Sequence, residues 1–208
     1  TPVAMADNFA MILVMDVSGS INDAEYNLQK QGYHDAITSL IPTDGTVALA
    51  AIQFGRNNTV DVAWDVIQSV AERDAFADAI LSSTRAGINT GYTAIGDAIY
   101  AADVYFGSLS GFVPDHYIID VSTDGANNYG SSPVTAAQWV VDSGSTDVVN
   151  ALGIGVTPTF AYGFNYDGTE AFNVKTTDFA SFSAALNEKF EKEIVVTTPE
   201  PLTLLLLG

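Results

Sequence analysis

The sequence predicts an α/β protein built on a doubly wound, mostly parallel sheet of about six strands, with one antiparallel edge strand and helices on both faces. Apolar runs of strand length alternate along the chain with segments that have an apolar period of 3.6 residues. Most of these runs are apolar throughout, as expected of strands that helices cover on both sides. The chain has 208 residues, of which 48% are apolar and 15% charged, so one domain with a sizeable core is expected.

The strands are predicted from the apolar runs, beginning with FAMILVM at residues 9–15. The segment 59–67 differs from the others, because Val60, Val62 and Trp64 alternate with the less apolar Asp61 and Ala63. This period of two indicates a half-exposed strand, and the turn GRNN before it predicts antiparallel pairing at the edge of the sheet. The predicted strands are residues 9–15, 46–54, 59–67, 117–121, 147–154 and 171–174.

The helices are predicted from the segments between the strands. Residues 23–41, 72–82, 93–106 and 134–143 fit helices. A last helix near the C-terminus has an apolar face made of Phe179, Phe182, Leu186 and Phe190, and Asp178 is expected to cap it. Together with the strands, these helices predict one Rossmann-like domain over residues 9–194.

The charge of the chain limits its partners. Seven Lys and Arg residues against 25 Asp and Glu give a formal net charge of -18, which disfavours nucleic acid and anionic lipid surfaces as partners and favours cations. The sequence contains no cysteine, which excludes disulfides, thiolate catalysis and cysteine-based zinc sites.

Oxygen-bearing side chains occur at three places in the sequence, two after predicted strands and one at the start of a predicted helix. Asp16, Ser18 and Ser20 end the first strand, Thr93 begins a helix after a glycine turn, and Asp124 ends the strand at residues 117–121. Ligands of doubly wound sheets bind beyond the carboxyl ends of the strands, so these loops are expected to converge. Hydroxyl and carboxylate oxygens suit a hard divalent cation, and Mg²⁺ is the predicted cofactor, with Mn²⁺ or Ca²⁺ as alternatives.

The first motif alone permits a second interpretation. The pattern Asp16-x-Ser18-x-Ser20 is also typical of a polar turn that caps the following helix. In the metal-site interpretation, Gly19 and Gly125 allow the tight turns that direct neighbouring side chains inward. Thr93 and Asp124, on separate elements, favour the metal site.

These motifs resemble the metal-ion-dependent adhesion site of von Willebrand factor type A domains. The resemblance rests on Asp16-x-Ser18-x-Ser20, on Thr93 within a G-x-T-x-x-G-x-A-I pattern and on Asp124-Gly125, and it covers about residues 9–193. The chain looks most similar to a bacterial group of exported proteins with the motif IDVSxDGxNN, here IDVSTDGANN. The resemblance implies that the three hydroxyls contact the metal directly or through water. It also implies that the two carboxylates bind through water or hold the ligand shell in place, and that a partner's carboxylate completes it.

The function predicted from this site is metal-dependent binding, in which a protein or an acidic polysaccharide is held through a metal-bridged carboxylate. Gly19, Asn127, Asn128 and Tyr129 lie near the predicted site in the sequence and are candidate ligand contacts. An enzyme is not predicted, because the chain has no G-x-S-x-G motif and Ser18 replaces the second carboxylate of aspartyl-phosphate phosphotransferases. The alternative is a metal-dependent hydrolase or a chelatase-like enzyme subunit.

The loop at residues 156–169 is long for a connection within a compact domain and is therefore a candidate functional segment. Its aromatic residues Tyr162, Phe164 and Tyr166 fit two interpretations equally well. They either form a contact surface near the metal or pack over the sheet.

Both ends of the sequence resemble targeting segments. Residues 1–8 contain Ala4-Met5-Ala6, a small-x-small pattern that is typical of signal-peptide cleavage and also compatible with an ordinary linker. Residues 195–208 contain Pro199-Glu200-Pro201 before a leucine run, which resembles the start of a PEP-CTERM sorting signal. This resemblance implies export to the surface or exterior of a Gram-negative bacterium, with membrane attachment only through a C-terminal anchor beyond this sequence.

Overall fold

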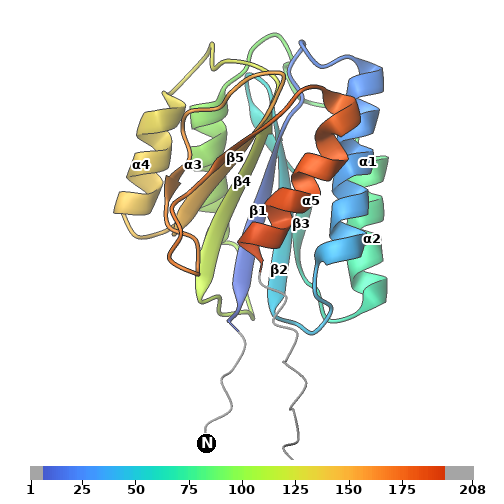
Figure 1. The fold of residues 1–208 in the computed structure, drawn as a ribbon, viewed down its shortest axis with the longest axis vertical. Helices are drawn as coiled ribbons and strands as arrows, with labels where there is room; N and C mark the ends of the chain where they lie inside the picture. Colours follow the sequence, from blue (N-terminus) through green and yellow to red (C-terminus); the bar gives the residue numbers. More distant parts are fainter. Residues whose placement is uncertain (1–6, 195–208) are drawn as a thin grey trace, which may run out of the picture.

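The fold is a seven-stranded sheet between two layers of helices, as the computed structural model shows for residues 7–194 (Figure 1). The strands are β1 (Phe9–Asp16), β2 (Val47–Phe54), β3 (Asn58–Val66), β4 (His116–Thr123), β5 (Val148–Ile154), β6 (Tyr162–Gly163) and β7 (Asn173–Thr176). The helices are α1 (Asp23–Leu40), α2 (Val70–Ser82), α3 (Ile95–Phe106), α4 (Pro133–Asp142) and α5 (Phe182–Glu193), with a 3₁₀ turn at Phe179–Ser181 before α5.

The strand order is β3-β2-β1-β4-β5-β6, and β7 pairs with β5. β1 lies between β2 and β4 and is parallel to both. From β1 the chain first builds the sheet toward β2 and β3 and then crosses to β4 and β5 on the other side. The strand order therefore reverses between β1 and β4, which is where ligands bind in doubly wound sheets.

The predicted fold class is confirmed, including the antiparallel edge strand. β3 pairs antiparallel with β2 at one edge of the sheet, as the alternation in residues 59–67 indicates. The two-residue β6 was not predicted, because its sequence, Tyr162-Gly163, is too short to show a period. It adds a second antiparallel pairing, with the start of β5. Asp178 caps the 3₁₀ turn that leads into α5, through a 2.9 Å hydrogen bond from the backbone N–H of Ser181.

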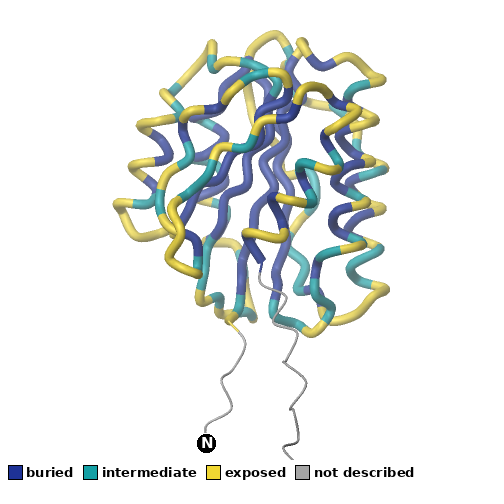
Figure 2. The backbone as a smooth tube through the Cα atoms, in the orientation of Figure 1, coloured by how far each residue is buried: buried dark blue, intermediate teal, exposed yellow. Residues whose placement is uncertain are grey.

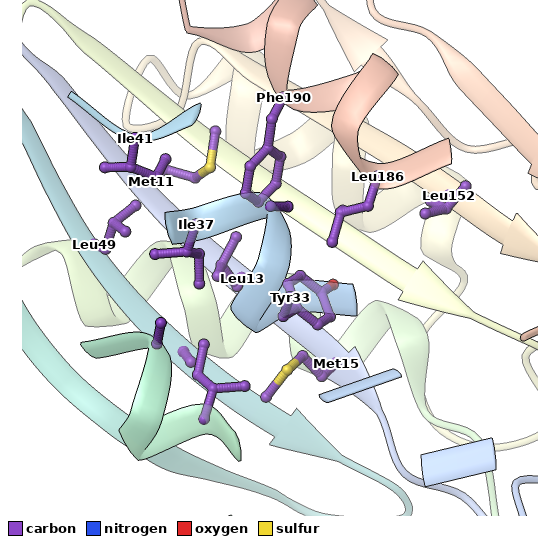
Figure 3. Close-up of a cluster of buried hydrophobic side chains, with 14 of the residues drawn as sticks. Met11, Leu13, Met15, Tyr33, Ile37, Ile41, Leu49, Leu152, Leu186 and Phe190 are labelled. Atoms are coloured by element: carbon purple, nitrogen blue, oxygen red, sulfur yellow. The ribbon is translucent and has the colours of Figure 1, made fainter. Parts of the chain in front are cut away.

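Side chains of β1 alternate between two cores. Met11, Leu13 and Met15 point into a core formed with α1, α2 and α5 (Figure 3). The intervening residues of β1 belong to the core formed with α3 and α4. All eight residues of β1 are buried, and the buried backbone in Figure 2 follows the central strands, whereas exposed residues concentrate in the loops and on the outer faces of the helices. Burial on both faces explains why β1 is apolar without interruption.

The two predicted targeting segments lie outside the described residues, which exclude 1–6 and 195–208. No helix within residues 7–194 is both long enough and apolar enough to cross a membrane.

Candidate metal centre

The predicted site residues come together in the loops at the carboxyl ends of β1 and β4, at the upper edge of the sheet in Figure 1. β1 ends at Asp16 and β4 ends at Thr123, and the two strands are paired in register up to Met15 and Ser122. The point where the strand order reverses therefore lies directly below these loops.

Asp16 is fully buried at the base of the site. Its Oδ1 accepts a 2.8 Å hydrogen bond from the backbone N–H of Ser18, and its Oδ2 accepts a 2.6 Å hydrogen bond from the hydroxyl of Thr123. Burial raises the pKa of the Asp16 carboxyl from 3.8 to about 6, although the hydrogen bonds from Thr123 and Ser18 oppose this shift. An ionised Asp16 is therefore costly unless a cation lies nearby.

Ser18, Ser20 and Asp124 form a chain of oxygen atoms above Asp16. The Oγ atoms of Ser18 and Ser20 lie 3.2 Å apart, and the Ser20 hydroxyl donates a 2.7 Å hydrogen bond to Oδ1 of Asp124. Partial burial raises the pKa of Asp124, while the hydrogen bond from Ser20 opposes the shift. The first and third predicted motifs, more than 100 residues apart in the sequence, thus contact each other directly.

Thr93 lies beside this chain of oxygens and is almost fully buried. A Cβ added to Gly125 would lie 3.7 Å from Oγ1 of Thr93 and 4.0 Å from Oγ of Ser20, so the Gly125 backbone adjoins both hydroxyls. The Thr93 loop is also tied to the Ser18–Ser20 loop, because the N–H of Gly19 donates a 2.6 Å hydrogen bond to the carbonyl of Thr90. The structure thus brings all five predicted metal ligands to one place.

Two asparagines predicted as ligand contacts hold the Thr93 loop in position. Oδ1 of Asn128 accepts a 2.8 Å hydrogen bond from the N–H of Thr93, and the N–H of Asn128 donates a 3.0 Å bond to the Thr93 carbonyl. Oδ1 of Asn127 accepts a 2.7 Å bond from the N–H of Ile95 and thereby caps α3, whose own N-cap residue, Ala94, supplies no side-chain hydrogen bond.

One residue of the site, Thr123, was not identified from the sequence. Thr123 immediately precedes Asp124, and its hydroxyl contacts both Asp16 and the backbone of Gly125. The signal that could have identified it is a hydroxyl residue at the last position of β4, next to a carboxylate already assigned to the site.

The three aromatic residues named in the long loop lie away from the site. Tyr162 belongs to β6, which pairs with the start of β5, and the N–H of Phe164 donates to the carbonyl of Asp147 just before that strand. Tyr166 packs edge-on against Phe9, at the opposite end of β1 from Asp16, about 23 Å along the strand. Tyr166 therefore packs over the sheet, away from the site. The earlier part of the loop lines a cavity of about 180 Å³ beside the site, together with Thr123, Gly125 and Asn127.

The oxygen-rich donor set fits a hard divalent cation. Within residues 7–194, no group of three or more His, Cys, Asp or Glu side chains could hold a metal ion. A cation at this place would depend on the hydroxyls of Ser18, Ser20 and Thr93, with Asp16 and Asp124 as the carboxylates. Two carboxylates balance the charge of a divalent ion, and neutral hydroxyls leave it able to bind a further anion.

A family match covers nearly the whole chain. The family described as "Protein of unknown function (DUF1194)" matches residues 6–198. The chain belongs to this family. No curated protein matches this DUF1194 chain.

Several solved structures resemble this DUF1194 chain. Proximal thread matrix protein 1 from the mussel byssus has a TM-score of 0.69 at 23% identity, over 90% of this chain and 46% of that protein. A second structure of the mussel protein has a zinc-occupied MIDAS motif. The pilus adhesin SpaC from Lactobacillus rhamnosus GG has a TM-score of 0.62 at 15% identity, over 89% of this chain and 30% of the adhesin. BatB from Bacteroides thetaiotaomicron has a TM-score of 0.58 at 20% identity, over 89% of this chain and 98% of BatB.

These likenesses show the fold, which is that of von Willebrand factor type A domains. The DUF1194 chain spans less than half the length of the mussel matrix protein and of the pilus adhesin.

Proposed function

We propose that this chain is a metal-dependent binding module of an exported bacterial protein. A Mg²⁺-class cation is held by Asp16, Ser18, Ser20, Thr93 and Asp124, and an acidic group of a protein or polysaccharide partner binds the cation. The observation that carries the proposal is the chain of contacts from Ser18 through Ser20 to Asp124, which begins beside Asp16. Asp16 is fully buried and has no positively charged partner among residues 7–194.

The electrostatics of the site support this proposal. A buried carboxylate is destabilised by the loss of water, and a bound divalent cation reverses that effect. The loops are also connected before any cation arrives, since the N–H groups of Gly19, Thr93 and Ile95 donate hydrogen bonds to neighbouring loops. A preorganised site loses less entropy when it binds an ion.

The function of the neighbours agrees with a binding role. Two of the structures with this fold are a thread matrix protein and a pilus adhesin, and the matrix protein has been seen with zinc in its MIDAS motif. Export is proposed from the two targeting patterns in the sequence, at residues 1–8 and 195–208.

Magnesium titration of EDTA-treated protein tests the proposal. A cation that binds only the folded state stabilises it by about 2.7 kcal/mol at 100 times its Kd, which corresponds to a rise of about 5–10 °C in Tm for a chain of this size. Thr93→Val should abolish the rise and leave the metal-free Tm nearly unchanged, because the Thr93 backbone makes the hydrogen bonds that hold its loop. Ser108→Ala, which removes an exposed hydroxyl elsewhere, is the control and should respond like the parent. A Tm that does not respond to Mg²⁺, Mn²⁺ or Ca²⁺ would refute the proposal.

A further inference from the structure

A second group of side chains adjoins the candidate metal centre and has no role in holding it. It consists of Arg56, Tyr92 and Tyr129, here called the Arg–Tyr cluster. The guanidinium carbon of Arg56 lies 5.5 Å from the centre of the Tyr92 ring and 4.8 Å from that of Tyr129, and the two rings lie 5.1 Å apart. Nη2 of Arg56 also donates a 3.2 Å hydrogen bond to the Tyr129 hydroxyl.

The cluster lies at the rim of the metal centre because the same loops carry both. Tyr92 immediately precedes Thr93, and Tyr129 immediately follows Asn128, which clamps Thr93. The turn that carries Arg56 is bonded to the same loop on both sides of Thr93. The N–H of Arg56 donates a 2.8 Å bond to the carbonyl of Asn89, and the Gly55 carbonyl accepts a 2.9 Å bond from the N–H of Ala94. Neighbouring Cα atoms are about 3.8 Å apart, so the backbone that carries Tyr92 is next to the Thr93 position of the site.

The charge of Arg56 is available to a partner. Of the three arginines, Arg73 forms an ion pair with Asp74 and Arg85 forms one with Asp23, whereas Arg56 pairs with no carboxylate among the described residues. A guanidinium has five N–H donors, and Tyr129 accepts from only one nitrogen. Arg56 thus carries a positive charge with no carboxylate partner among residues 7–194, on a chain with a net charge of -18.

The geometry of the cluster indicates what it would bind. Tyr92 is 43% exposed and Tyr129 is 37% exposed, so a partner can contact both side chains. Arg56 lies over one face of each ring, which reduces the aromatic surface that a sugar ring could stack on. Partly exposed tyrosines next to an oriented arginine are instead typical of the residues that dominate protein–protein binding energy. Guanidinium also matches the planar geometry of a carboxylate.

We propose that the partner is a protein segment with at least two acidic side chains. This inference rests on the proposed function: one carboxylate binds the cation, and a second binds the free donors of Arg56. The edges and hydroxyls of Tyr92 and Tyr129 contact the peptide between them. The cation accepts one further anion and Arg56 supplies a positive charge beside it, so the two together select ligands with two neighbouring negative charges.

Fluorescence anisotropy with a labelled oligoglutamate peptide tests this inference, with oligogalacturonate as the polysaccharide competitor. The full chain should bind the peptide in Mg²⁺ and not in EDTA. Arg56→Gln should weaken this binding by about tenfold or more, the effect of losing a charged hydrogen-bonded pair. Arg73→Gln changes the net charge equally at a distant, already paired site and should stay within about twofold of the parent. Equal Tm values for the three proteins in Mg²⁺ would show that folding is unaffected.

The outcomes separate this inference from the proposed function. Mg²⁺-dependent peptide binding that is the same in Arg56→Gln and in the parent would overturn the role of the Arg–Tyr cluster and leave the metal-dependent function standing. Mg²⁺-dependent binding of oligogalacturonate without binding of oligoglutamate would overturn the peptide assignment. A lack of binding to both probes would overturn it as well, while the effect of Mg²⁺ on Tm would still decide whether the metal site exists.

Discussion

Replacing the buried carboxylate of Asp16 by an amide should change how the stability of the metal-free protein depends on pH. Burial raises the Asp16 pKa from 3.8 to about 6. Between these pH values the folded state binds a proton that the unfolded state has lost, so stability decreases as pH rises from about 4 to about 6. A tenfold change in a protonation equilibrium is worth about 1.4 kcal/mol, so the loss reaches about 3 kcal/mol above pH 6. Asp16→Asn has no proton to lose and should not show this decrease.

Asparagine fits the same hydrogen bonds, so the variant is expected to fold. Its amide oxygen can accept from the N–H of Ser18, as Oδ1 of Asp16 does. Its amide nitrogen would then face the Thr123 hydroxyl, which can accept that bond and donate to the Gly125 carbonyl, 3.2 Å away. The comparison concerns the pH profile, because a constant offset between the two proteins reports only on packing.

Urea denaturation in EDTA at several pH values between 4 and 8 measures the effect. The free energy of unfolding of the parent should fall relative to that of Asp16→Asn by about 3 kcal/mol between pH 4 and pH 7, and saturating Mg²⁺ should remove most of that difference. Parallel profiles in EDTA would refute the reasoning, since they would mean that Asp16 remains ionised in the folded state without a cation.

Two further predictions concern the framework that supports the site. Lys189→Met should lower the free energy of unfolding by about 3–5 kcal/mol, because it leaves the buried Asp120 without its ion pair. Lys192→Met, on the exposed side of α5, is the control and should cost less than about 1 kcal/mol in the same urea denaturation experiment. Equal losses would contradict the assigned burial. Gly96→Ala should lower the free energy of unfolding by about 1–3 kcal/mol, since the new Cβ would lie 2.3 Å from a backbone carbonyl oxygen just before α4. Gly107→Ala is the control and should change Tm little, because the backbone of Gly107 is already helical. A normal Tm for Gly96→Ala would show that this loop can move away.

The position of the site could be predicted from the sequence because it depends on strand ends. A parallel sheet places the carboxyl ends of neighbouring strands at one edge, so Asp16 and Asp124 could be assigned to the same edge once β1 and β4 were identified. Thr93 followed from its place before an apolar helical period. Local patterns were sufficient here, because each residue lies at the boundary of an element with a clear period.

The partners of these residues could not be predicted, since they depend on contacts between distant segments. Asn127 caps α3 from a loop that lies about thirty residues beyond the start of that helix, and nothing local distinguishes this role from ligand contact. The buried ion pair of Asp120 and Lys189 was missed for a related reason. Asp120 is a single charged residue within an apolar run of β4, so no local pattern indicates its partner. That partner lies on α5, near the other end of the chain.

The polar residues of β4 connect the buried core to the site. Asp120 pairs with Lys189 of α5 at 2.5 Å, and the Ser122 hydroxyl accepts bonds from Gln29 and Tyr33 of α1 at 3.1 and 2.9 Å. One residue further on, Thr123 contacts Asp16. Because each of these groups is buried and loses water, displacing β4 would break several hydrogen bonds at once. β4 therefore sets the position of Asp124 relative to Ser20, and the geometry of the candidate metal centre depends on the helices that hold this strand as much as on the loops above it.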